Sequence, residues 1–286
     1  MTGFVVTTLV VGAVLVGALC VAMLFDVALA GGARALAVRE VESRRWRPPF
    51  VRGQELFDWA RSAACGTVDR VLREPTDART PRRLMSEIEA GLEHALVPGS
   101  VPRRHAGPVP CPEVGQGVVA LTAPEALALA DCLREYLSPA ELELMRRESD
   151  DNVGWIRRIS SVYGSDAPCA LQRADCVCKA WRARPLHCRA VHGVTLARAT
   201  GCEDPWLDQD AFRHAEQICA GARVGLREGL GRVGLDDGLC EMHGALARAL
   251  EVPNAAERWA RGERLFAACL PGDVEALGLD SARVLH

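Results

Sequence analysis

Aromatic residues and net charge are both scarce in this chain: 5% of its 286 residues are aromatic, and the formal net charge is only -3. Proteins that bind nucleic acid generally carry a strongly basic surface, and many also stack aromatic side chains on bases. The overall balance therefore favours no nucleic-acid partner. A content of 49% hydrophobic and 25% charged residues is typical of one folded domain with appendages rather than of a disordered protein.

Several catalytic motifs are missing as well. The chain has no Ser–His–Asp order, no Gly-rich phosphate loop and no His-Glu-x-x-His sequence. Gly225, Gly229 and Gly231 lie in a helix-like stretch that does not follow a strand, so they are not a dinucleotide-binding fingerprint. Four carboxylates that can act as acids or bases each have a helix-capping explanation: Glu125, Glu141, Asp150 and Asp151. These absences favour a binding protein over an enzyme.

Residues 4–25 form an unbroken run without a charged side chain. At about 1.5 Å per residue this run makes a helix of about 33 Å, enough for a hydrocarbon core of about 30 Å. The alternative is a cleaved signal peptide, because residues 28–30 (Ala-Leu-Ala) look like a cleavage site. No basic segment precedes the run, and it is longer than a signal-peptide core, so we expect a transmembrane anchor within residues 1–30.

Arginines follow this run between residues 34 and 47, whereas neither Lys nor Arg precedes it. By the positive-inside rule, the rest of the chain lies in the cytoplasm. We therefore expect a single-pass protein of the inner membrane that contacts the lipid bilayer through residues 4–25. A protein partner within the membrane is also possible. Thiols stay reduced in the cytoplasm, so a cluster among the twelve cysteines favours metal binding or redox chemistry over structural disulfides.

Helical patterns account for most of the remaining chain. Gln54–Leu72 and Thr80 to about Leu96 have amphipathic spacing and make up a juxtamembrane segment over residues 31–97. A proline-rich stretch then marks the start of a cysteine-cluster domain over residues 98–200. The C-terminal region, residues 201–286, is predicted to be helical and to pack on that domain.

Two Ser/Thr-x-x-Glu sequences have the spacing of a capping box. Thr122 and Glu125 open a helix to about residue 136, and Ser138 and Glu141 open another through Arg147. The apolar stretch 118–121 is a candidate for one of very few strands. Periodicity predicts further helices: a short one capped by Asp151 or Asn152, and longer ones over residues 208–230, 239–250 and 255–270. The predicted fold is mainly α, with a transmembrane helix, a helical cytoplasmic domain, a Cys-rich metal-binding loop and little or no β.

Four thiols lie within the segment from Cys169 to Arg189. Basic residues are interleaved with them: Arg173, Lys179, Arg182, Arg184 and Arg189. Four thiolates around a divalent ion carry net negative charge, which neighbouring guanidinium groups offset while they donate hydrogen bonds to sulfur. The alternative is a set of buried thiols, because cysteine is often buried. An apolar core does not hold five basic residues, so metal ligation is favoured.

The segment also resembles a known family. Cys178 with an aromatic residue at Trp181, followed by Arg184-Pro185-x-x-Cys188-Arg189, is similar to the second half of the YkgJ-type cysteine-cluster family, whose members are described as zinc- or iron-chelating domains. The resemblance covers about residues 111–193, and Cys111 alone remains of the family's dense first run. It implies these metal ligands: Cys111, Cys169, Cys178 and Cys188. It also implies three supporting residues around them: Arg184, Pro185 and Arg189.

Alternatives remain within the ligand set. Cys176 is separated from Cys178 by one residue, so it can replace Cys178 or Cys111, or bind a second iron. His187 and His192 are alternative nitrogen ligands if Cys111 lies too far away. A second set is most simply helix packing, with Cys240 and His243 on one helix face: His214, Cys219, Cys240 and His243. The remaining thiols are expected to be small hydrophobic residues: Cys20, Cys65, Cys132 and Cys269.

The sequence therefore predicts a membrane-anchored metal-binding protein. A structural zinc ion is favoured over an iron–sulfur cluster, although four cysteines suit either. One alternative is an iron–sulfur enzyme or redox protein, because the cysteine cluster is similar to that of flagellin lysine methylase. Another alternative is a membrane-tethered subunit of a larger complex, in which the metal only stabilises the fold.

Overall fold

The structure is a computed structural model that describes residues 54–96, 119–156, 169–173, 177–190, 205–267 and 269. All of these residues belong to one compact unit, Trp46–His286. The mainly helical character predicted from the sequence is confirmed in the described part of the chain. The apolar run over residues 4–25 and the proline-rich stretch lie outside it. None of the described helices combines the length and the apolar character that a membrane crossing needs.

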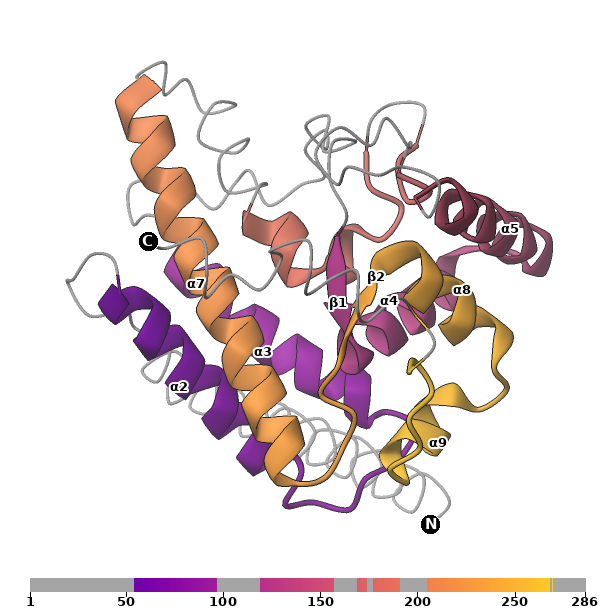
Figure 1. Cartoon of the computed structure of the whole chain (residues 1–286), viewed down its shortest axis with the longest axis horizontal. Helices are drawn as coiled ribbons and strands as arrows, with labels where there is room; N and C mark the ends of the chain where they lie inside the picture. Colours follow the sequence, from indigo (N-terminus) through magenta and orange to yellow (C-terminus); the bar gives the residue numbers. More distant parts are fainter. Residues whose placement is uncertain are drawn as a thin grey trace, which may run out of the picture. The chain divides into compact units, whose positions relative to one another are not determined.

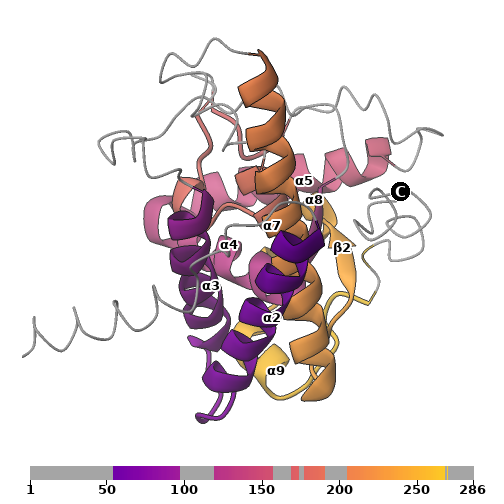
Figure 2. The same ribbon diagram turned by 90° about the vertical axis from the view of Figure 1, so that its left-hand side faces the viewer.

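The first two described helices match their predicted ranges: α2 spans Gln54–Val71 and α3 spans Thr80–Leu96. The hydroxyl of Thr80 accepts a hydrogen bond from the backbone N–H of Asp77 at 2.8 Å, which supports the start of α3. The predicted apolar positions are fully buried: Leu84, Ile88 and Leu92. This face of α3 packs against α4, which spans Ala123–Tyr136 (Figure 2).

The long helix α7, Pro205–Arg232, lies side by side with α2 (Figure 1). The contact is made where glycines recur every four residues on α7: Gly221, Gly225 and Gly229. A Cβ atom added at Gly225 would lie only 2.0 Å from the carbonyl oxygen of Arg61. The three glycines meet α2 in the same order along both helices, so the two helices run parallel. These glycines, which sequence analysis excluded as a dinucleotide site, allow close backbone packing.

Two short strands cross the middle of this unit. β1, Ala120–Thr122, pairs antiparallel with β2, Leu239–Glu241, and Leu121 is opposite Cys240. Each strand runs directly into a helix: β1 into α4, and β2 into α8, which spans Met242–Glu251 (Figure 1).

The prediction that a helix begins at residue 239 is wrong. Residues Leu239–Glu241 are extended because they hydrogen-bond to β1. The carboxylate of Glu241 then caps α8 by accepting hydrogen bonds from the N–H groups of His243 at 2.9 Å and Gly244 at 2.8 Å. Cys240 therefore lies on a strand, and only the residues after it are helical.

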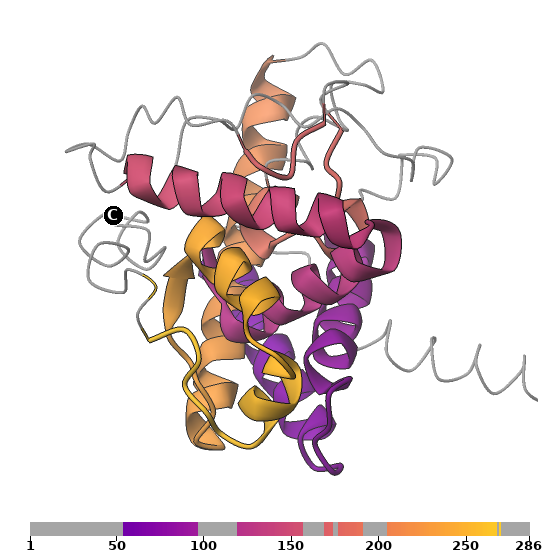
Figure 3. The same cartoon turned by 90° about the vertical axis from the view of Figure 1, so that its right-hand side faces the viewer.

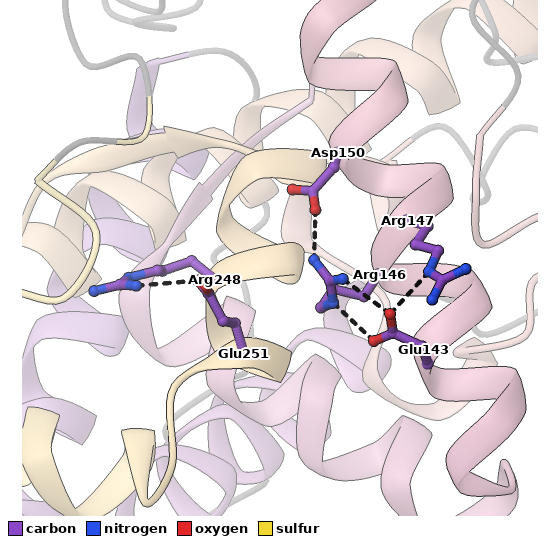
Figure 4. Close-up of polar contacts among 6 residues, drawn as sticks. All are labelled: Glu143, Arg146, Arg147, Asp150, Arg248 and Glu251. Carbon is purple, nitrogen blue, oxygen red and sulfur yellow. Dashed lines mark hydrogen bonds and ion pairs between the residues drawn. The ribbon is translucent and has the colours of Figure 1, made fainter.

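Helix α5 spans Pro139–Ile156 and packs against α8 (Figure 3). Its start follows the predicted capping box, because Glu141 accepts hydrogen bonds from the N–H and hydroxyl of Ser138 at 2.7 Å each. The predicted break near Arg147 and the second helix start at Asp151 or Asn152 are wrong. Instead, Arg146 bonds Glu143 and Asp150 on successive turns, and these pairs bridge the expected break (Figure 4).

The last described helix, α9, spans only Ala255–Ala260. It ends early because Gly262 has a φ of 88°, a left-handed conformation that favours glycine, and its N–H bonds the carbonyl of Trp259 at 2.8 Å. The predicted helix to residue 270 is therefore too long. The chain beyond α9 still enters the core, where Leu265 and Phe266 are both buried.

Candidate metal centre

The cysteine segment begins with a tight reversal of the chain. The N–H of Gln172 donates to the carbonyl of Cys169 at 2.9 Å, and Gln172 forms an isolated antiparallel bridge with Cys178. The N–H of Lys179 donates to the carbonyl of Leu171 at 2.7 Å. These bonds bring the backbone of Cys178 opposite Gln172. Because Gln172 is only three residues after Cys169, two of the predicted ligands, Cys169 and Cys178, lie in one region.

A second turn follows directly, beginning with the short 3-10 helix η2 at Trp181–Ala183. The guanidinium group of Arg184 lies over the ring of Trp181, with 3.6 Å between its central carbon and the ring centroid, a cation–π contact. A helical turn over residues 186–190 then carries Cys188, and the N–H of Arg189 donates to the carbonyl of Pro185 at 3.0 Å. The Arg-Pro-x-x-Cys-Arg sequence is therefore a compact, internally bonded turn.

Glu125 joins this turn to helix α4. Its Oε2 atom accepts hydrogen bonds from the N–H and the hydroxyl of Thr122, both at 2.8 Å, while Oε1 accepts one from the N–H of Leu186 at 2.9 Å. Glu125 is 3% exposed, so three protein donors replace water around its carboxylate. The predicted capping role is confirmed, and the bond to Leu186 also attaches the turn that carries Cys188 to the core.

Arg189 joins the same turn to helix α3. Its side chain is 6% exposed, and its Nη2 atom lies 2.8 Å from Oε2 of Glu89. The guanidinium group also donates to the carbonyl of Arg184 at 3.0 Å and to that of Arg182 at 3.2 Å. A buried ion pair is stable only when its remaining donors are bonded, and these carbonyls meet that need. Arg189 therefore maintains the shape of the turn.

Helix α7 contributes Cys219 and Arg223 to the same region, and both are buried. Burial raises the pKa of Cys219 to about 12, although the nearby positive charges of Arg189, Arg223 and Arg184 oppose that rise. Burial also lowers the pKa of His187 to about 4, with help from the charge of Arg223. His187 is therefore neutral at neutral pH. Three buried guanidinium groups concentrate positive charge beside the cysteine segment.

The predicted ligands are only partly described. Cys169, Cys178 and Cys188 are half-buried and pack against the main hydrophobic core. Cys111, Cys176 and His192 lie outside the described residues. Within the described ranges, no group of three or more His, Cys, Asp or Glu side chains could hold a metal ion. Cys169, Cys178 and Cys188 therefore do not assemble a complete site by themselves, and the ligand set stays a prediction.

The second set does not share a helix face as expected. Cys240 lies in β2 and His243 in α8, so the prediction that both lie on one helix is wrong. Burial lowers the pKa of His243 to about 4. His214 and Cys219 lie on α7, and the described residues of this set form no metal-holding group with one another.

Sequence reasoning missed Glu89, Arg223 and the contact between Glu125 and Leu186. These residues come from α3, α7 and α4, and the Glu125 to Leu186 bond joins positions 61 residues apart. Local spacing cannot reveal such contacts. Capping alone explained Glu125 in the sequence, so its burial and its bond to Leu186 were not predicted.

Comparison with models of known protein families, with curated proteins and with solved structures finds no match to this chain.

Proposed function

We propose that this chain is a membrane-anchored metal-binding protein whose Cys-rich segment holds a zinc ion or an iron centre. Cys169, Cys178 and Cys188 would supply three thiolates, and Cys111 or Cys176 the fourth. The observation that carries the proposal is the gathering of buried guanidinium groups beside a hydrogen-bonded cysteine segment. A metal bound by four thiolates carries excess negative charge, and such a centre is stabilised by nearby cations and N–H donors.

The chemistry of the donor set fits a soft or borderline metal. The three described cysteines are partly buried and pack against the hydrophobic core, so part of each side chain is shielded from water. Glu125 and Arg189 attach the backbone around Cys188 to two different helices, so the position of that sulfur is defined before any metal binds. Pre-organised ligands lower the entropic cost of metal binding.

Packing alone is a weaker account of the arginines. Arginine is rarely buried unless its charge is paired, and here Arg184, Arg189 and Arg223 are each less than 10% exposed. Arg189 has a carbonyl-binding role as well as an ion pair. An anionic metal centre beside these three groups would stabilise their positive charge further, in addition to the partners that they already have.

A structural zinc ion is the form we propose first, with an iron–sulfur cluster as the alternative. Four cysteines suit both, and the two differ in colour, because thiolate-bound iron absorbs visible light and zinc does not. Metal analysis and an absorption spectrum of the full-length chain, purified in detergent without oxygen, separate the two forms. We expect tightly bound metal in either case, and a preparation free of both metals contradicts the proposal.

Cys188→Ser is the decisive variant, with Cys132→Ala as its control. Cys132 is a buried thiol of α4 outside the cysteine segment. We expect Cys188→Ser to lose metal and, if the metal is structural, to lower the melting temperature. Cys132→Ala should keep the metal content of the natural chain. Equal metal content in the two variants argues against Cys188 as a ligand.

The anchor belongs to the proposal as well. It rests on the apolar run over residues 4–25 and on the arginines after it, which place the metal centre on the cytoplasmic side of the inner membrane. We expect the full chain to resist alkaline carbonate extraction from membranes and a chain lacking residues 1–30 to be released. Release of the full chain contradicts the anchor but leaves the metal proposal intact.

A further inference from the structure

Two thiols from distant parts of the sequence meet beside the short sheet. Cys240 lies on β2, and Cys269 follows α9. The Sγ atom of Cys240 lies 3.4 Å from the carbonyl oxygen of Phe266, and the N–H of Cys269 donates to that same oxygen at 2.9 Å. Both cysteines thus contact one carbonyl oxygen, and each thiol perturbs the pKa of the other. They are therefore direct neighbours, although sequence analysis treated Cys269 as a small hydrophobic residue.

The two thiols differ in their access to solvent. Cys240 is 4% exposed, whereas Cys269 is only partly buried. A Cβ atom added at Gly244 would lie 3.9 Å from Cβ of Cys269, which places Cys269 beside the first turn of α8. A partly accessible thiol beside a buried one is the arrangement in which the first reacts with an incoming molecule and the second resolves the product.

The pKa values of the two thiols are shifted in opposite directions, and the more accessible thiol has the lowered pKa. The neighbouring Cys240 thiol lowers the pKa of Cys269, and the positive charge of Arg248 lowers it further, while burial, Glu241 and Asp236 oppose these effects. The neighbouring Cys269 thiol, together with burial, raises the pKa of Cys240. The S–H group of Cys240 donates to the carbonyl of Phe266 at 3.4 Å, which retains its proton. Cys269 is therefore the thiol that ionises first.

We propose that Cys269 and Cys240 form a thiol–disulfide exchange site whose co-reactant is a low-molecular-weight disulfide, with Cys269 as the attacking thiol and Cys240 as the resolving thiol. Neither cysteine belongs to the proposed metal ligands, so this inference does not rest on the metal proposal. Within the described residues no third metal-binding side chain joins the pair in a metal-holding group. The pair is therefore assigned to sulfur exchange rather than to a second metal.

The exchange balances in two steps. The Cys269 thiolate attacks one sulfur of the small disulfide, and the disulfide bond breaks to give a mixed disulfide on Cys269 and one small thiolate, which takes the proton of Cys240. The Cys240 thiolate then attacks Sγ of Cys269 and expels the second small thiolate, which takes a proton from water. The two cysteines lose two electrons and the small disulfide gains them. The new bond ties the chain after α9 to β2.

The first test uses the natural full-length chain in detergent, without added reductant. It is incubated with glutathione disulfide, quenched with acid, alkylated and mapped by mass spectrometry. We expect a Cys240–Cys269 disulfide that a dithiol reductant reverses. Recovery of both cysteines as alkylated thiols, or Cys269 joined to any other cysteine, overturns the proposal.

Variants separate the two roles. Cys240→Ala should stop at a stable glutathione adduct on Cys269, and Cys269→Ala should leave Cys240 unmodified. An adduct on Cys240 in the second variant contradicts the assigned order.

A third measurement needs no variant and therefore does not depend on whether the substituted chains fold. Iodoacetamide should alkylate Cys269 of the natural chain at neutral pH at least about tenfold faster than Cys240, because only the ionised and accessible thiol reacts. Equal rates refute the inference.

Discussion

Replacing Gly225 by alanine tests the packing of α7 against α2. The new Cβ atom would lie 2.0 Å from the carbonyl oxygen of Arg61 and 2.7 Å from its carbonyl carbon. Carbon and oxygen atoms in close contact normally lie about 3.3–3.6 Å apart. The obstacle is helix backbone, which cannot swing aside as a flexible side chain can. The two helices must therefore move apart by about 1 Å or more, by comparison with that contact distance.

Two effects of opposite sign set the magnitude. Alanine is a better helix former than glycine by about 1 kcal/mol. Overpacking a tight contact costs about 1–3 kcal/mol and occasionally more, and the separation also weakens the neighbouring contacts at Gly221 and Gly229. A clash with backbone belongs at the upper end of that range. We therefore expect Gly225→Ala to lower the free energy of unfolding by about 2 kcal/mol.

Gly66→Ala is the matched control. Gly66 lies in α2, and a Cβ atom added there meets no atom within 4 Å. The same chemical change should therefore raise stability by about 0.5–1 kcal/mol, through helix propensity alone. Urea unfolding of both full-length variants, followed by far-UV circular dichroism, measures the difference. If Gly225→Ala is as stable as Gly66→Ala, the close approach of α2 and α7 is wrong.

Three further predictions concern buried polar groups. Burial raises the pKa of Glu241 from 4.5 to about 7, so the folded protein binds this proton more tightly than the unfolded protein does. The free energy of unfolding should therefore fall by about 3 kcal/mol as the pH rises from below 4.5 through 7. Glu241→Gln should abolish this part of the pH dependence in urea titrations, and an unchanged profile refutes the assignment. Burial lowers the pKa of His243 from 6.5 to about 4. The neutral imidazole therefore contributes about 3 kcal/mol to the free energy of unfolding above pH 6.5, and this contribution is lost as the pH falls through 4. His243→Gln should flatten this acid limb of the stability curve, and an unaltered limb counts against it. Glu125→Ala and Glu141→Ala each remove the carboxylate of a capping box, but only Glu125 is buried and bonded to the cysteine segment. Thermal unfolding should therefore show a loss of stability about 1–3 kcal/mol larger for Glu125→Ala. Equal losses contradict the role of Glu125 in holding the segment.

Helix starts were predictable because their signals are local. Thr122 with Glu125 and Ser138 with Glu141 begin helices within one residue of the expected position. The continuation of α5 past Arg147 was missed because Asp151 and Asn152 resemble a new cap, whereas Arg146 pairs with Asp150 along one continuous helix. Cap residues mark where a helix can begin, and tertiary and side-chain contacts decide whether it does.

Long-range contacts account for the other errors. The three residues of β2 have no strand signal of their own, and their extended form depends on pairing with β1. The same limit applies to the candidate site. Its cysteines and arginines were identified from their density, but the half-buried Glu89 and the buried Arg223 come from separate helices. No property of these two residues in the sequence distinguishes them from solvated charges.

The pairing of α2 with α7 also constrains the order in which the protein can mature. The cysteine segment is translated after α2 and before α7, so the ribosome exposes it before α7 exists to pack against α2. At about 5–20 residues per second, this interval lasts on the order of seconds. During that time the sulfur atoms are open to the surrounding fluid from every side. Helix α7 then brings the buried Cys219 and Arg223 beside the segment, so we expect metal loading to compete with completion of the nascent chain.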